Sequence, residues 1–144
     1  MSIKQISVFL ENRPGKLKEM TAVLAEHHID MRALSIAETK DFGIARLIVD
    51  DAFNAANVLK ENGFVSSITK VLAVAIPDEP GGLDKLLSVF ADANVNIEYM
   101  YAFFGGIGVK EACMIFRVAE TKAAETRLAG KGLKILTSED LAQA

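Results

Sequence analysis

Two short stretches decide the fold: Asn12-Arg13-Pro14-Gly15-Lys16-Leu17 and Asp78-Glu79-Pro80-Gly81-Gly82-Leu83. Their prolines are 66 residues apart (80 − 14) in a chain of 144 residues. The same offset places residues 28–31 (His-Ile-Asp-Met) on residues 94–97 (Asn-Val-Asn-Ile). Self-similarity at a fixed spacing indicates a structural repeat. The sequence therefore predicts two units, residues 1–70 and 71–144.

Each unit carries the same order of strand and helix signals. Apolar residues alternate at Ile6, Val8 and Leu10, as in a half-buried strand, and Leu83, Leu86, Leu87 and Phe90 follow the spacing of one helix face. Asn12 and Asp78 are residue types that cap the helices that we expect to begin at Pro14 and Pro80, and His28 and Asn94 are expected to end them. The predicted strands are 6–11, 31–38, 44–49, 64–68, 71–76, 97–104, 112–118 and 133–136, the later helices are 52–62 and 122–129, and hairpin turns are expected at 40–43 and 105–108.

The order strand-helix-strand-strand-helix-strand occurs twice, which predicts the α+β fold class. We expect two ferredoxin-like units, each with a four-stranded antiparallel sheet and two helices on one face. A unit of about 70 residues seldom buries enough surface to be stable alone, so we expect the two units to dock. Exposed sheet edges and faces favour further association, so we also expect a homodimer.

Composition excludes several classes of protein. Apolar residues make up 51% and charged residues 24% of the chain, as in folded globular proteins. The net charge is −3 and the chain has no basic run, so we expect no nucleic-acid partner. The apolar runs are too short to span a membrane. One cysteine and a start without a secretory signal favour a cytoplasmic protein.

The residue types that catalysis or metal binding would need are not arranged for it. His27 and His28 are adjacent, so they would point to different sides of a helix, and Cys113 lies in an apolar strand without a nearby histidine. Tyr99, Tyr101 and Phe103 alternate along a strand without basic residues among them, which favours packing in a core or interface. We therefore expect no catalytic residue, no metal ligand and no cofactor.

The two Pro-Gly stretches, the helix stripe after each and the apolar-Asx-apolar steps at 29–31 and 95–97 resemble the ACT domain. The resemblance covers essentially the whole chain as a tandem pair. ACT domains are regulatory modules that commonly bind an amino acid at an interface between two such domains. The resemblance thus implies a free amino acid as ligand and a regulatory sensor.

The resemblance also implies which residues bind that ligand: the two loops and the start of the strand that follows each first helix. Helix N-termini carry partial positive charge and suit a carboxylate, and the glycines at 15, 81 and 82 would let a ligand approach the backbone. Alternatively, each Pro-Gly pair is only a tight turn, and Asp30 and Asn96 are only turn residues. The candidate residues are Asn12, Arg13, Pro14, Gly15, Lys16, Leu17, Asp30, Met31, Asp78, Glu79, Pro80, Gly81, Gly82, Leu83, Asn96 and Ile97.

Charge favours the first loop. Arg13 and Lys16 would attract a carboxylate, whereas Asp78 and Glu79 would repel one. We therefore prefer the first loop paired with Asn96. The apolar residues Met31, Leu34, Ile97 and Met100 point to a branched-chain or other partly apolar amino acid.

Three functions remain open from the sequence. The first is a free-standing tandem sensor that acts through self-association or a separate enzyme partner. The second is a regulatory subunit of an amino-acid biosynthetic enzyme such as acetolactate synthase, whose regulatory subunit also carries ACT-type sequence. A structural oligomerisation module is the third, whereas a small catalyst is disfavoured because no nucleophile–base pair is in view.

Overall fold

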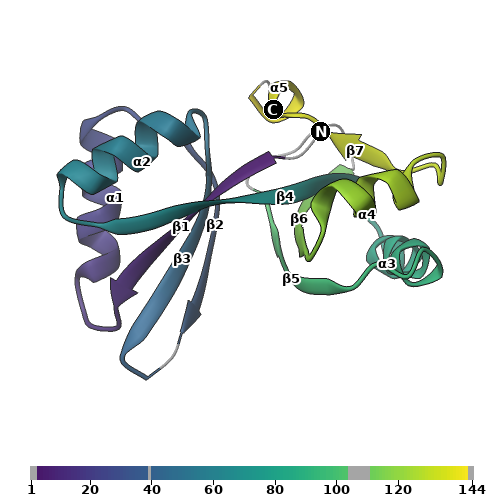
Figure 1. Cartoon of the computed structure of the whole chain (residues 1–144), viewed down its shortest axis with the longest axis horizontal. Coiled ribbons are helices and arrows are strands. Elements are labelled where there is room, and N and C mark those ends of the chain that lie inside the picture. Colours follow the sequence, from purple (N-terminus) through teal and green to yellow (C-terminus); the bar gives the residue numbers. More distant parts are fainter. Residues whose placement is uncertain (1–2, 39, 104–110, 143–144) are drawn as a thin grey trace. The chain divides into compact units, whose positions relative to one another are not determined.

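The computed structural model describes residues 3–38, 40–103 and 111–142 of the chain. They form two compact units, one comprising Lys4–Thr69 and the other beginning at Lys70. The predicted turn at 105–108 lies outside the described residues. Each unit is described by itself below, with its elements labelled in Figure 1.

The first unit is a four-stranded antiparallel sheet with two helices. Its strand order is β2-β3-β1-β4, and β1 and β2 both run antiparallel to β3. Side chains of both helices pack in one core with alternate residues of the strands, such as Ile6, Val8 and Leu47. Both helices therefore cover the same face of the sheet. The elements are β1(Ile3–Glu11), α1(Lys16–Glu26), β2(Met31–Glu38), β3(Phe42–Val49), α2(Ala52–Glu61) and β4(Val65–Pro77).

The second unit repeats this plan. Its strands lie in the order β5-β6-β4-β7, which is the same order as in the first unit when counted from its own first strand. The predicted stripe Leu83, Leu86, Leu87 and Phe90 packs on its sheet, and the rings of Phe90 and Phe116 are 4.9 Å apart. Its further elements are α3(Gly82–Asp92), β5(Ile97–Ala102), β6(Glu111–Val118), α4(Thr121–Leu128), β7(Lys134–Leu136) and α5(Ser138–Ala142). The α+β class and the two ferredoxin-like units are confirmed.

One strand serves both units. We expected separate strands at 64–68 and 71–76, but β4 runs without interruption over Val65–Pro77. The residues between, Thr69 and Lys70, include neither glycine nor proline, so nothing in the local sequence forces a turn there. The helix α5 was not predicted, because five residues are too few to show a helical period.

The face of the second sheet opposite its helices is also apolar. Tyr101, Phe103, Cys113 and Ile115 are all buried, and Tyr99 is half-buried with its ring stacked on that of Tyr101 at 6.5 Å. The expectation that these aromatic side chains pack in a core or interface is therefore consistent with the structure.

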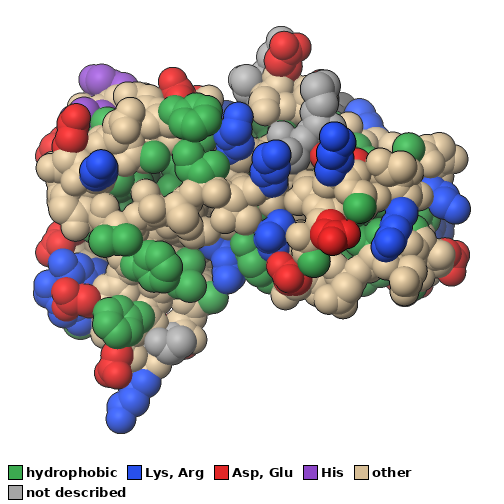
Figure 2. All heavy atoms as spheres, viewed as in Figure 1, with side chains coloured by type: hydrophobic (Ala, Val, Ile, Leu, Met, Phe, Trp, Pro, Cys, Tyr) green, Lys and Arg blue, Asp and Glu red, His purple; other side chains and the backbone are tan. Residues whose placement is uncertain are grey.

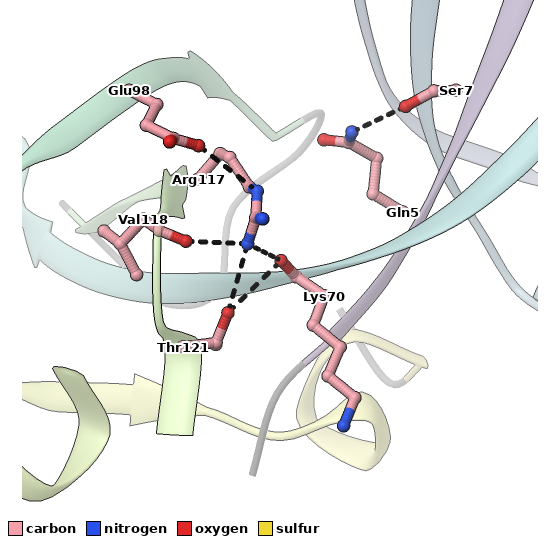
Figure 3. Close-up of polar contacts among 7 residues, drawn as sticks. All are labelled: Gln5, Ser7, Lys70, Glu98, Arg117, Val118 and Thr121. Carbon is pink, nitrogen blue, oxygen red and sulfur yellow. Dashed lines mark hydrogen bonds and ion pairs between the residues drawn. The ribbon is translucent and has the colours of Figure 1, made fainter. Parts of the chain in front are cut away.

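A polar cluster on the second unit ties β4 to the start of α4. One guanidinium nitrogen of Arg117 donates to the carbonyls of Val118 and Lys70 at 2.6 and 3.2 Å (Figure 3). The buried Thr121 hydroxyl donates to the same Lys70 carbonyl at 3.5 Å, and Glu98 pairs with Arg117 at 3.4 Å. Burial of the Thr121 hydroxyl is tolerated because it has hydrogen-bond partners.

None of the helices within the described residues has the length and apolar character needed to cross a bilayer.

Candidate functional site

Each Pro-Gly pair forms a turn between a strand and a helix. The Lys16 N–H donates to the Arg13 carbonyl at 3.4 Å, and the Gly82 N–H donates to the Glu79 carbonyl at 3.1 Å. Gly15 (φ 88°, ψ −13°) and Gly81 (φ 86°, ψ −5°) have the dihedral angles of the third residue of a type II turn. Such turns favour proline followed by glycine, so the repeated motif specifies its own geometry.

The helices begin later than predicted. They start at Lys16 and Gly82, so Pro14 and Pro80 lie in the turns and not in the first helical turn. The prediction that Asn12 caps α1 is wrong. Its Nδ2 lies 3.4 Å from both Glu38 Oε2 and the Lys40 carbonyl, and its N–H donates to the Asp41 carbonyl at 2.9 Å. Asn12 therefore holds the loop to the β2–β3 hairpin.

The glycines do not all serve the purpose that we expected. A Cβ on Gly82 would clash with the Pro77 carbonyl oxygen. Glycine is therefore needed at this position for the close approach of the Pro77 backbone, and the approach of a ligand is not the reason. A Cβ on Gly15 or Gly81 would meet nothing within 4 Å, but both residues have a positive φ that other residues adopt only with strain. Space for a ligand is thus present at Gly15 and Gly81. Their positive φ by itself explains why these residues are glycine, so the glycines need not indicate a ligand.

The first loop borders a cavity of about 210 Å³. Four of the predicted residues line it, namely Asn12, Arg13, Lys16 and Leu17. The remaining walls come from the end of β1 and from the β2–β3 hairpin, and they are Leu10, Glu11, Ile36, Glu38 and Gly43. Sequence reasoning missed Ile36 and Glu38, although the hairpin register, which pairs Glu38 with Gly43, would have placed them here.

The charges around this cavity suit a zwitterion. Arg13 and Lys16 are its cations, and Glu11 and Glu38 are its carboxylates. Arg13 pairs with Glu11 at 2.9 Å, and this hydrogen bond is the main reason that the pKa of Glu11 is lowered. Lys16 pairs with Glu19 at 3.1 Å. Ion pairs that solvent reaches contribute little to stability, so a ligand carboxylate can replace Glu11 or Glu19 as the partner of these cations at a small cost in free energy.

Within the first unit, Asp30 and Met31 lie away from the loop. Glu11, which ends β1, is opposite Phe42, whereas Met31 is opposite Val49 at the other end of β3. Seven residues of antiparallel strand span about 24 Å. Asp30 is also occupied locally, because its carboxylate pairs with Arg32 at 3.2 Å. A single first unit thus does not bring the predicted loop and strand residues together.

The second unit separates its predicted residues in the same way. Its loop residues Asp78 and Glu79 are exposed after β4, and Ile97 is opposite Val118 at the far end of β6. Asn96 lines a separate cavity of about 210 Å³ with Asn94, Glu120 and Arg127. Arg127 donates to the Asn94 carbonyl at 3.2 Å. Asn96 therefore has its own polar recess.

A β-bulge follows the predicted strand residues in both units. The register shifts between Met31 and Ala33 in β2, and between Ile97 and Tyr99 in β5. Bulges re-aim side chains and occur often beside functional sites. The residues inside the two bulges, Arg32 and Glu98, pair with Asp30 and Arg117 respectively. The sequence showed no signal for this irregularity.

The described residues contain no group of three or more histidine, cysteine or carboxylate side chains placed to hold a metal ion. Cys113 is buried, and desolvation raises the pKa of its thiol to about 12. A thiol in that state is not a nucleophile near neutral pH.

Comparison with known proteins places these features in a family. The family model of the ACT domain pair matches residues 1–144. None of the curated proteins that were compared matches the chain.

Solved structures share the fold. Protein BT0572 from Bacteroides thetaiotaomicron is 40% identical with a TM-score of 0.91, over 100% of this chain and 98% of that one. The ligand-free regulatory subunit of aspartate kinase from Thermus thermophilus is 20% identical with a TM-score of 0.65, over 87% of each chain. The corresponding subunit from Thermus flavus is 17% identical with a TM-score of 0.61, over 87% of this chain and 89% of that one.

Proposed function

Because this chain belongs to the ACT domain pair family, a regulatory domain type, we propose that it is a sensor that binds a free amino acid. The observation that carries the proposal is the cavity at the first loop. It combines two cations, two carboxylates and the first turn of α1. The first N–H groups of a helix have no acceptor within the helix and favour an anion nearby.

In this proposal Arg13 and Lys16 bind the ligand carboxylate, and Glu38 accepts from its ammonium group. Leu17 and the exposed Ile36 contact a partly apolar side chain, such as that of a branched-chain amino acid. The second loop, Asp30, Met31, Asn96 and Ile97 remain proposed contacts of a site that needs more than one ACT unit. The need for more than one unit is supported by the distance of about 24 Å between the loop and the strand residues inside the first unit.

We further propose that the protein is a homodimer in the cytoplasm. A site shared between units couples ligand binding to association, because separation of the units would destroy the site. The single cysteine fits a reducing compartment.

Regulation of a separate enzyme is the second candidate function. The Thermus proteins similar in fold are regulatory subunits of aspartate kinase, and the resemblance noted from sequence extends to the regulatory subunit of acetolactate synthase. Copurification of a larger catalytic chain would support this function, and a self-contained dimer that binds an amino acid would favour the free sensor.

A thermal-shift screen of the full chain against the twenty amino acids at millimolar concentration tests the proposal. A ligand at 100 times its dissociation constant adds about 2.7 kcal/mol of stability. A selective rise in melting temperature is expected. The Arg13→Ala variant should reduce the rise, whereas Lys18→Ala, which removes a cation of α1 that lines none of the described cavities, should not. Absence of any shift in the unaltered protein would contradict amino-acid binding.

A further inference from the structure

A larger cavity lies next to the loop cavity, within the same unit. Its volume is about 570 Å³, and its walls come from β1, α1, β3 and the start of β4. The two cavities share Leu10, Glu11 and Lys16. Lys16 therefore borders both spaces.

The walls of this larger cavity are apolar and rich in aromatic rings. Phe9, Phe42 and Phe64 are three of the chain's eight phenylalanines, and all three line it together with Val65. Phe9 is 49%, Phe42 58% and Val65 66% exposed. Figure 2 shows hydrophobic side chains gathered over the ends of β1 and β3 and below β4, with charged side chains at their border.

Leaving these side chains in water costs free energy that burial against a ligand would recover. Contiguous apolar surface with a polar rim is typical of a binding site. Small-molecule sites have volumes of roughly 300–1,000 Å³, mostly apolar walls and a few polar groups, and this cavity fits that description.

Lys16 supplies the charge. Its side chain is only 21% exposed, and its ammonium group pairs with a Glu19 carboxylate that is itself 54% exposed. Both residues line the cavity. The aliphatic part of a lysine side chain can pack on apolar surface while the ammonium group remains available to an anion.

We propose that this cavity receives the aromatic side chain of an amino acid whose carboxylate is bound by Lys16. The proposal rests on the proposed amino-acid binding and changes its ligand class: an aromatic side chain in the larger cavity replaces the branched aliphatic side chain beside Leu17 and Ile36. An aromatic ring fits here better than a branched aliphatic chain, because ring pairs gain from edge-to-face and offset contacts at 4.5–7 Å. The loop cavity of about 210 Å³ is left for the polar groups of the ligand.

Calorimetry on the full chain with four probes tests the ligand class. L-phenylalanine should bind roughly tenfold more tightly than L-leucine. 3-Phenylpropanoate, which lacks the ammonium group, should bind more weakly than phenylalanine but measurably, and 2-phenylethylamine, which lacks the carboxylate, should not bind. Leucine that binds as tightly as phenylalanine would overturn the inference and leave the proposed function intact.

Variants of exposed residues test the site without disturbing the core. Phe42→Ser and Val65→Ser should each raise the dissociation constant of phenylalanine, by about tenfold for Phe42→Ser. Phe53→Ser is the matched control, since Phe53 is 61% exposed and does not line the described cavities. Lys16→Met should weaken phenylalanine binding, whereas Lys18→Met should not.

The remaining outcomes also separate the two proposals. If Phe42→Ser and Val65→Ser leave affinity unchanged but reduce self-association in sedimentation, the cavity is a surface for a second copy and the inference falls. If Arg13→Ala weakens phenylalanine binding and neither cavity variant does, the ligand side chain lies elsewhere. If no amino acid binds, the inference and the proposed function fall together.

Discussion

At the scale of single residues, the end of α1 contains a residue in an unfavourable conformation. His28 has φ 55°, and the N–H groups of His28 and Ile29 donate to the carbonyls of Ala25 and Leu24, as in a Schellman motif. Because the left-handed region disfavours side chains with a Cβ, His28→Gly should raise the free energy of unfolding by about 0.5–1 kcal/mol, measured by urea denaturation. His27→Gly is the control, since His27 has φ −99° and should lose stability. Equal effects of the two changes would contradict this account.

At the scale of elements, the start of α3 depends on a close approach of the backbone to Pro77. Gly82→Ala should lower the free energy of unfolding by about 1–3 kcal/mol, because the new Cβ would clash with the Pro77 carbonyl oxygen. Lys16 occupies the equivalent position at α1 and already has a Cβ, so Lys16→Ala provides the control. Thermal unfolding of the two variants gives the comparison, and a Gly82→Ala protein as stable as the unaltered one would refute the clash.

At the scale of the whole molecule, β4 belongs to the sheets of both units. If one unit unfolds, its part of β4 loses its partners, and the part of β4 in the other unit then becomes the frayed end of a strand. We therefore expect the two units to unfold in one transition. Cys113 is the chain's single cysteine and reports on the second unit. With a pKa raised to about 12 by burial, its thiol should react slowly at pH 8 in the folded protein and quickly once unfolded. Labelling that precedes the loss of the far-ultraviolet circular dichroism signal in a urea series would show separate unfolding.

The elements themselves were largely predictable because their signals are local. The apolar stripe of α3, the ends of both first helices at His28 and Asn94, and the strand–turn–helix order all follow from spacing within about a dozen residues. The Pro-Gly stretches were predicted as turns, but the sequence did not predict that each turn extends through its glycine. Glycine in the third position of a type II turn moves each helix start to the residue after it.

The candidate site was only half predictable. Its loop residues Asn12, Arg13 and Lys16 carry a local motif, whereas Ile36 and Glu38 reach the same cavity through the register of a hairpin. Register depends on which residues of separate strands face each other, and a shift by one residue would turn every side chain to the other face. Phe9 and Phe42 come to the larger cavity in the same way, through the pairing of β1 with β3.

The sequence by itself determined the two-fold repeat, the order of helices and strands in each unit, the glycine-dependent turns and the charge of the first loop. These features depend on residues close together in the chain, where dihedral preferences and hydrophobic period act directly. Only the tertiary structure decided that Asn12 holds a hairpin, that Gly82 faces the Pro77 carbonyl, that β4 is one strand, and that an aromatic cavity adjoins the loop. Each of these depends on contacts between distant segments or on unbroken strand pairing, which local preferences do not specify.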